Sequence, residues 1–316
     1  MIFPPDLIEE QIFNVDQAWQ LLDDKLPQFK KLHKIWWAWY KDTVQDNHMK
    51  KVINEAMVIS YARMAKRNGS LSLNPRSYHS EHHLDDLLYR LMALSHFKSS
   101  RDIPPYGWSL LSLFMCCHDL RQSEDNNNKD LIGNNERASY QEVIRIIDIV
   151  DKKKYFRQEH KELLKLMIHG STFGKGEDNM GNIYKGNLVK YLLKDVAYFE
   201  NIDKELAFIA CDIDTANVSA DLIDYAKSSI NVYNEIQNIS PVEVSAHSFF
   251  GELQEQYFFD LQKFNSKLGK QAFANKKLEN APIVKSICEV IKQLDPETNN
   301  EKVVEIYLSQ VDEKQC

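Results

Sequence analysis

The sequence predicts an all-α fold. Apolar residues recur at helical spacing along most of the 316 residues, and no segment shows the strict alternation of apolar and polar residues that is typical of a half-buried strand. One stretch, Trp108 to Cys117, is apolar on every side, as expected of a helix at the centre of a bundle. Hydrophobic residues make up 43% of the chain and charged residues 27%, so the chain can bury an ordinary globular core.

Residues 6 to about 66 are expected to be helical, because apolar side chains such as Leu7, Ile8 and Ile12 follow the helical period. A group of aromatic residues near position 38 favours core packing over a ligand-binding role. The segment Arg67-Asn68-Gly69-Ser70 interrupts the pattern. We therefore expect residues 1–69 to form a helical segment that packs on the next domain. The aromatic group comprises Trp36, Trp37, Trp39 and Tyr40.

A second helix is expected from Ser77 onwards, with Leu84, Leu87 and Leu91 on its buried side. His83 falls on this side, and His79 lies one helical turn before it. The apolar helix at 108–117 follows a loop with two prolines and ends at His118 and Asp119. The two ionisable residues would therefore lie at the end of a buried helix, where they are costly unless bonded or bound to a metal.

The remainder of the chain is also predicted to be mostly helical. The segment 121–135 is polar and is expected to be a loop, and the glycine-rich segment 170–187 is typical of a mobile lid. The charged residues near the end are expected to include a frayed tail. Helices are expected at 136–150, 161–169, 188–199, 203–217, 283–294 and, as one or two long helices, within 218–275.

Composition excludes several classes of function. The net charge of −7 argues against a general nucleic-acid surface. The chain has five cysteines, which is an odd number, and they lack the spacing of a disulfide framework. This predicts reduced thiols and hence a cytoplasmic protein. The first residues lack a basic segment followed by an apolar one, so no secretory signal is expected. The longest apolar run, near residues 110–117, is too short to span a bilayer, so no membrane partner is predicted.

Imidazole and carboxylate side chains form a candidate metal site. His79, His83, His118-Asp119 and Asp212 each lie within or beside an apolar stretch, and this ligand set suits a divalent cation such as Mn²⁺, Fe²⁺, Mg²⁺, Ni²⁺ or Zn²⁺. Asp214 is two residues beyond Asp212 and is expected to face solvent or cap the helix. The alternative is that His118 and Asp119 are a capped, solvent-facing pair; for His82, a surface position is the preferred interpretation.

These residues resemble the HD-domain superfamily of metal-dependent phosphohydrolases, whose pattern is His, then His-Asp, then Asp. Further matches are Arg76-x-Tyr78-His79-x-x-x-His83, Asn135-Glu136-x-x-Ser139 and Ile168-x-x-x-Thr172. The set resembles bacterial predicted HD phosphohydrolases and, more distantly, class I cyclic-nucleotide phosphodiesterases. The resemblance covers about residues 70–220. It implies an HD-domain helical bundle at 70–220, with additional helices before it and in an extension at 221–316.

The resemblance also implies roles for individual residues. One or two divalent ions would be held by His83, His118, Asp119 and Asp212, with Asp119 bridging if two ions bind. A metal-bound water would attack phosphorus in a phosphomonoester or phosphodiester of a small nucleotide-like substrate. His79 would act as general acid, and Glu136 would orient His79 or accept a proton. Candidates for substrate contacts are Arg76, Tyr78, Arg121, Arg137, His169 and Thr172, with the arginines suited to phosphate.

One position departs from the phosphodiesterase pattern. That family has a histidine three residues after the aspartate of its His-Asp pair, and here the position holds Gln122. The second metal ion of that family is therefore less well supported. An alternative function is a catalytically inactive HD scaffold that binds metal or nucleotide as a regulatory module. A further alternative is a helical interaction protein whose histidines are incidental.

Overall fold

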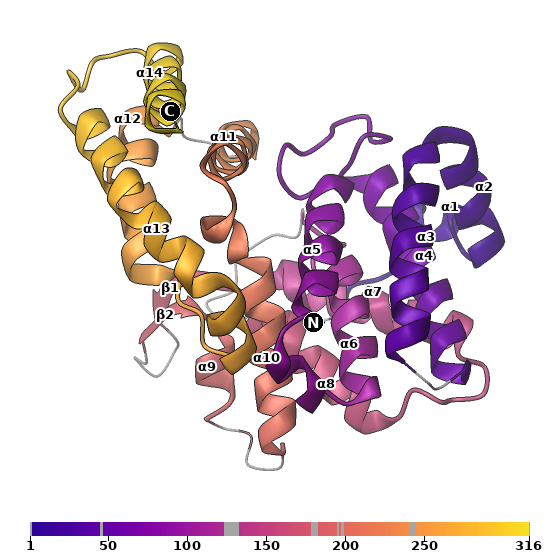
Figure 1. The fold of residues 1–316 in the computed structure, drawn as a ribbon. Coiled ribbons are helices and arrows are strands. Elements are labelled where there is room, and N and C mark those ends of the chain that lie inside the picture. The colour runs from indigo at the N-terminus through magenta and orange to yellow at the C-terminus, as the bar shows by residue number, and fades with distance from the viewer. Residues whose placement is uncertain are drawn as a thin grey trace. The chain divides into compact units, whose positions relative to one another are not determined.

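The computed structural model describes residues 2–44, 47–122, 133–177, 183–194, 196, 199–239 and 244–315. The prediction of an all-α fold is confirmed: most of these residues are in helices, and the described residues form one two-stranded sheet (Figure 1). The chain divides into two compact units. Unit 1 comprises Met1–Asp214 and Ser266–Leu268, and unit 2 comprises Thr215–Asn265 and Gly269–Cys316. The first helices and the predicted central domain thus lie in the same unit.

The first four helices of unit 1 are α1 (Leu7–Gln11), α2 (Val15–Lys25), α3 (Pro27–Thr43) and α4 (Asn47–Arg67). Asn14 and Gln17 cap the start of α2 reciprocally, which ends α1 and sets the turn between them. The aromatic group has the predicted core role, because Trp36 and Tyr40 on α3 are fully buried. The Tyr40 hydroxyl lies 2.7 Å from Ser109 Oγ, so α3 is fixed against the central helix.

Helix α6 (Pro105–Cys117) is the centre of unit 1, as its apolar sequence predicts. Every residue from Gly107 to Cys117 is buried. It contacts α3, α4, α5 (Glu81–Leu94), α7 (Asn134–Val150), α8 (Gln158–Gly170) and α10 (Asn201–Asp214) (Figure 1). A short 3₁₀ helix (Lys98–Asp102) connects α5 to α6. Because helices surround α6 on all sides, residues at its end are buried beneath their neighbours.

The glycine-rich segment after α8 forms a hairpin, and the prediction that the chain has no strands is wrong here. Strands β1 (Phe173–Glu177) and β2 (Ile183–Asn187) pair antiparallel, with Gly174 opposite Gly186. The predicted lid partly lies outside the described residues, since its tip at 178–182 is not among them. Most of the predicted loop at 121–135 also lies outside them. The hairpin leads into α9 (Val189–Leu192).

Unit 2 has its own core. It contains α11 (Leu222–Ile239), α12 (Ala246–Ser248), most of α13 (Lys267–Lys292) and α14 (Asn300–Gln315), with a 3₁₀ turn at Ala216–Ser219 and π-helical segments at Phe249–Leu253 and Gln256–Leu261. The expected frayed tail is wrong, because α14 buries one face. Its buried residues recur every four positions and are Val303, Tyr307 and Val311.

No helix in the described ranges combines the length and apolarity that a membrane span requires.

Candidate metal centre

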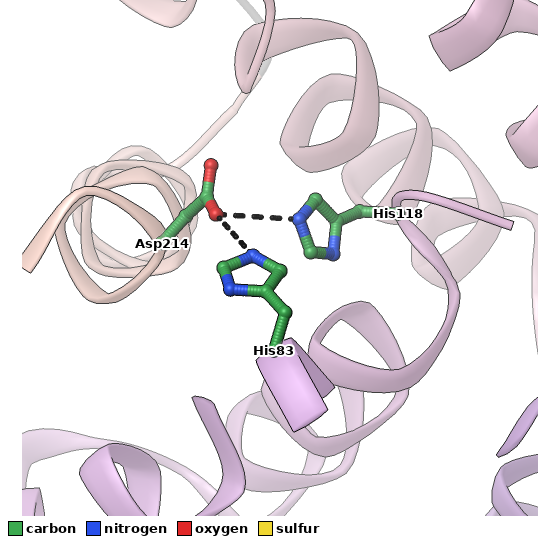
Figure 2. Close-up of side chains that lie close together, drawn as sticks. All are labelled: His83, His118 and Asp214. Atoms are coloured by element: carbon green, nitrogen blue, oxygen red, sulfur yellow. Dashed lines mark hydrogen bonds and ion pairs between the residues drawn. The ribbon is translucent and has the colours of Figure 1, made fainter. Parts of the chain in front are cut away.

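Two imidazoles and one carboxylate converge in unit 1. His83 lies in the first turn of α5, His118 caps the end of α6, and Asp214 is the last residue of α10. Their side chains point toward one another from the three helices, with one Asp214 oxygen facing both rings (Figure 2). One ligand atom from each residue lies within 4.8 Å of the others, so the cluster can hold a metal ion.

The separations between these atoms match those of ligands around a shared ion. Asp214 Oδ1 lies 3.2 Å from His83 Nε2 and 3.3 Å from His118 Nε2. Ligands at about 2.0–2.2 Å from a cation lie roughly 3.0–3.5 Å from one another in octahedral or tetrahedral geometry. The donor set and its spacing therefore fit a divalent cation without rearrangement of the helices.

The local structure of His118 prepares one nitrogen for coordination. Its Nδ1 lies 3.2 Å from the Phe114 carbonyl oxygen, which only accepts, so Nδ1 carries the hydrogen in the neutral ring. Its Nε2 is buried and completes no hydrogen bond in the described part of the chain, although two carboxylates lie close to it. A backbone acceptor on one ring nitrogen is the usual way in which proteins orient a metal-binding histidine.

Asp119 adds a second carboxylate to the cluster. Its Oδ2 lies 3.0 Å from His118 Nε2 and 3.7 Å from His83 Nε2, while Gln122 Nε2 donates to its Oδ1 at 2.7 Å. Gln122, which the sequence marked only as a departure from the phosphodiesterase pattern, therefore orients Asp119. One oxygen of Asp119 is committed to Gln122, and the other faces the imidazoles.

The carboxylate from α10 is Asp214 and not the predicted Asp212. Asp212 is fully buried, and its Oδ2 accepts hydrogen bonds from Ser266 N at 2.8 Å and Ser266 Oγ at 2.6 Å. Residues two apart in a helix point in nearly opposite directions, so only one of the two can face the imidazoles. Asp214 is 16% exposed and does not face solvent as expected.

His79 lies near the cluster but not for the predicted reason. Helix α5 begins at Glu81, so His79 precedes the helix instead of lying one turn before His83. Its Nε2 is 4.0 Å from Asp119 Oδ2, and its side chain is 31% exposed. The Tyr78 ring packs against both imidazoles, with centroids 4.9 Å from His79 and 4.7 Å from His83. His82 is exposed, as expected.

The charges within the cluster are strongly coupled. Burial lowers the pKa of His118, but the carboxylates of Asp119 and Asp214 outweigh it and raise this pKa well above its ordinary value. Burial raises the pKa of Asp119 and Asp214, whereas His118 and its neighbouring imidazoles lower both below the ordinary carboxyl range. The charged forms of His118, Asp119 and Asp214 therefore stabilise one another.

Glu136 lies within electrostatic reach of this centre. Burial raises its pKa, and the charge of Asp119 raises it further. The Thr172 hydroxyl and His118 act in the opposite direction, although Thr172 Oγ1 forms no hydrogen bond of ordinary geometry within the described residues. The predicted roles of Glu136 and Thr172 stay predictions.

His169 is buried, and no described contact joins it to the imidazoles of the centre. Burial and the charges of Lys165 and Arg137 lower its pKa to about 3, so its ring is neutral at pH 7. Within the described residues, its Nε2 has no hydrogen-bond partner. The predicted substrate contacts of His169 and Arg137 stay predictions.

The other predicted arginines differ in position. Arg76 donates to the Gln122 carbonyl and so lies beside the turn that follows Asp119. Arg121 instead enters a buried charge network, with Nη1 3.3 Å from Glu9 Oε1 and 3.4 Å from the Pro4 carbonyl oxygen. These contacts give Arg121 a structural role and do not support a phosphate contact.

Comparison with known proteins adds no family to this description. The chain matches no family model, no curated protein and no solved structure.

Proposed function

We propose that this protein is a metal-dependent phosphohydrolase that cleaves a phosphomonoester or phosphodiester bond in a small nucleotide-like substrate. The observation that carries the proposal is the convergence of His83, His118 and Asp214, with Asp119 beside them, from three helices onto one point. The order of these residues along the chain also resembles that of the HD-domain superfamily. Buried imidazoles and carboxylates are costly unless they are paired or bind a cation.

His83, His118, Asp214 and Asp119 would hold the ion. A divalent cation bound there supplies a Lewis acid and lowers the pKa of a coordinated water toward neutrality. We propose one ion instead of two, because Gln122 occupies Asp119 Oδ1 and the pattern lacks the additional histidine. Oxygen and imidazole ligands together suit Mn²⁺, Fe²⁺ or Zn²⁺.

The remaining roles follow from position. His79 is partly exposed and lies beside Asp119, so it can deliver a proton to the leaving oxygen. Glu136, whose pKa is raised by burial, can accept or release a proton. Tyr78 holds the two imidazoles of its own segment at fixed angles.

The test combines metal analysis with activity. Purified protein is assayed for bound metal and for hydrolysis of p-nitrophenyl phosphate esters, cyclic nucleotides, guanosine polyphosphates and deoxynucleoside triphosphates, with Mn²⁺, Fe²⁺, Mg²⁺, Ni²⁺ or Zn²⁺ added. His83→Ala is expected to lose both metal and activity. His79→Ala is expected to keep the metal and lose activity by about 10²–10⁴-fold.

His82→Ala is the matched control, because His82 is in the same segment but exposed, and it is expected to behave as the unmodified protein. Metal binding without turnover of any substrate, unaltered by His79→Ala, would favour the second candidate. That candidate is a regulatory HD scaffold, and the commitment of Gln122 to Asp119 is the observation in its favour.

A further inference from the structure

The turn that carries Asp119 is held by side chains from other helices. Arg67 at the end of α4 donates from Nη1 to the Leu120 carbonyl oxygen at 2.9 Å. Asn68 Nδ2 lies 3.4 Å from the Asp119 carbonyl oxygen. The Arg121 backbone N–H donates to Ser139 Oγ on α7 at 3.0 Å. The direction in which Asp119 leaves α6 therefore depends on residues that do not touch the candidate ion site.

Arg67 is the most constrained of these residues. Its Nε donates to Asp6 Oδ2 at 2.8 Å and its Nη2 to Asp6 Oδ1 at 3.0 Å, so the guanidinium group binds this carboxylate in a bidentate manner. Nη2 also lies 3.0 Å from Glu142 Oε2 on α7. The Arg67 side chain is 12% exposed, and the two carboxylates hold its guanidinium group in this orientation. In this orientation Nη1 reaches the turn that follows α6.

Asp6 belongs to a segment that the same charge network holds in place. We define the N-terminal clamp as residues Phe3–Ile12. Asp6 Oδ1 also caps α1 by accepting from the Glu9 backbone N–H at 2.9 Å. Glu9 is buried and pairs with Arg63 at 3.3 Å and with Arg145 at 2.6 Å. The clamp is thus joined to α4 and α7 on one side and, through Arg67, to the turn after α6.

We propose that Arg67, held by Asp6 of the N-terminal clamp, is a positioning residue for the metal centre. It fixes the Leu120 carbonyl and thereby the direction of Asp119. This inference rests on the proposed metal site and extends it to a segment more than a hundred residues earlier in the chain. Residues outside the ligands that orient them commonly change metal affinity by about 10–100-fold when replaced.

The experiment uses Arg67→Lys, which keeps the charge near Asp6 and Glu142. A lysine ammonium is a point charge and cannot hold two carboxylates and a carbonyl in the same fixed fork. The matched control is Arg145→Lys. Arg145 contacts the same clamp, at Glu9 and at the Phe3 carbonyl, but in the described part of the chain it has no contact with residues 118–122.

Mn²⁺ affinity of the full-length proteins is measured by isothermal titration calorimetry, and their thermal midpoints are measured in chelator. Arg67→Lys is expected to weaken Mn²⁺ binding by about 10–100-fold, as for other orienting residues. Arg145→Lys is expected to lower the thermal midpoint by a comparable amount but to leave the Mn²⁺ affinity unchanged. If Arg67→Lys does not fold, Asp6→Asn is used instead. In that variant Arg67 still contacts Glu142, but it no longer pairs with the carboxylate that orients its guanidinium group.

Equal Mn²⁺ affinities for the unmodified protein and Arg67→Lys, or equal losses in the Arg67 and Arg145 variants, overturn the inference alone. Absence of Mn²⁺ binding by the unmodified protein overturns the proposed metal site as well. The two failures are therefore distinguishable.

Discussion

At the residue scale, hydrogen bonds to neighbouring groups decide which side-chain atoms of the candidate centre can bind an ion. The Phe114 carbonyl occupies one nitrogen of His118, and Gln122 occupies one oxygen of Asp119. The remaining nitrogen and oxygen face the same point as Asp214 Oδ1. His118 and Asp119 are thus each oriented by a neighbour outside the cluster of proposed ligands.

Replacing the two aspartates of α10 separately distinguishes a ligand from a structural residue. Asp214→Asn is expected to abolish metal binding, because it removes the charged oxygen between the imidazoles. Asp212→Asn is expected to keep the metal and to lower the free energy of unfolding by about 1–3 kcal/mol, because Ser266 loses a charged acceptor. Metal content and urea denaturation of both variants check this, and metal loss in Asp212→Asn alone would contradict the assignment.

Metal binding should release a proton. Despite burial, Asp119 and Asp214 raise the pKa of His118 well above its ordinary value, which favours the protonated imidazole, and Nε2 must lose this proton to coordinate an ion. Affinity for Mn²⁺ is therefore expected to fall as the pH falls, by about tenfold per unit while one proton is displaced. Calorimetric titrations in buffers of different ionisation enthalpy measure the proton, and identical heats in every buffer would refute its release.

The sequence located most of this centre but not its final member. His83, His118 and Asp119 were named as candidate ligands, because His83 falls on the buried side of a helix and His118 and Asp119 end an apolar one. Asp214 was missed because it and Asp212 both follow the same apolar run. Only the packing of α10 against α5 and α6 decides which of the two faces the imidazoles. No signal within one chain predicted that Gln122 would bind Asp119.

At the element scale, α4 joins α1 to α7 through buried charge. Arg63 is almost fully buried, and its Nη1 lies 3.3 Å from Glu9 Oε2 and 3.2 Å from Glu142 Oε1. Its Nη2 donates to the Ile12 carbonyl at 3.0 Å. Four arginines and three carboxylates share this network, so removal of one member takes an ion-pair partner from buried neighbours. The members are Asp6, Glu9, Glu142, Arg63, Arg67, Arg121 and Arg145.

Arg63→Met is therefore expected to lower the free energy of unfolding by about 3–5 kcal/mol, the usual cost of breaking a buried ion pair. Lys30→Met is the control, because Lys30 pairs with Asp23 at 3.1 Å while both side chains are largely exposed. That variant should lose at most about 1 kcal/mol. Urea denaturation of both proteins makes the comparison, and similar losses would argue against a stabilising role for the network.

Sequence patterns predicted the helices of this molecule better than its hairpin. The period of apolar residues predicted α6, α7 and α8, because these helices bury a stripe or their whole surface. Strand β1 has glycine at alternate positions, β2 contains one glycine, and neither has an apolar face, so no pattern marked them. Helix α14 was not predicted, because the segment is rich in charged residues, although Val303, Tyr307 and Val311 have helical spacing.

At the scale of the whole molecule, the two units have separate cores, and only unit 1 contains the candidate centre. A ligand that binds the folded state alone stabilises it by about 2.7 kcal/mol at a hundredfold excess over its Kd. For a unit of this size, we expect this stabilisation to raise the thermal midpoint by roughly 5–10 °C.

Differential scanning calorimetry should therefore show two transitions, of which Mn²⁺ shifts one and EDTA reverses the shift. The His118→Ala variant should show the same two transitions without the response to Mn²⁺. A single transition that Mn²⁺ shifts as a whole would mean that the two units unfold together.

The N-terminal clamp has a consequence for the order of events during synthesis. The Phe3 backbone N–H donates to Gln141 Oε1 at 2.8 Å, and the Phe3 carbonyl accepts from Arg145 at 3.1 Å. A growing chain exposes Phe3 to Ile12 long before the ribosome has produced α7. The contacts of the clamp with α7 can therefore form only after residues 134–150 have been made, whereas its contacts with α4 become possible much earlier.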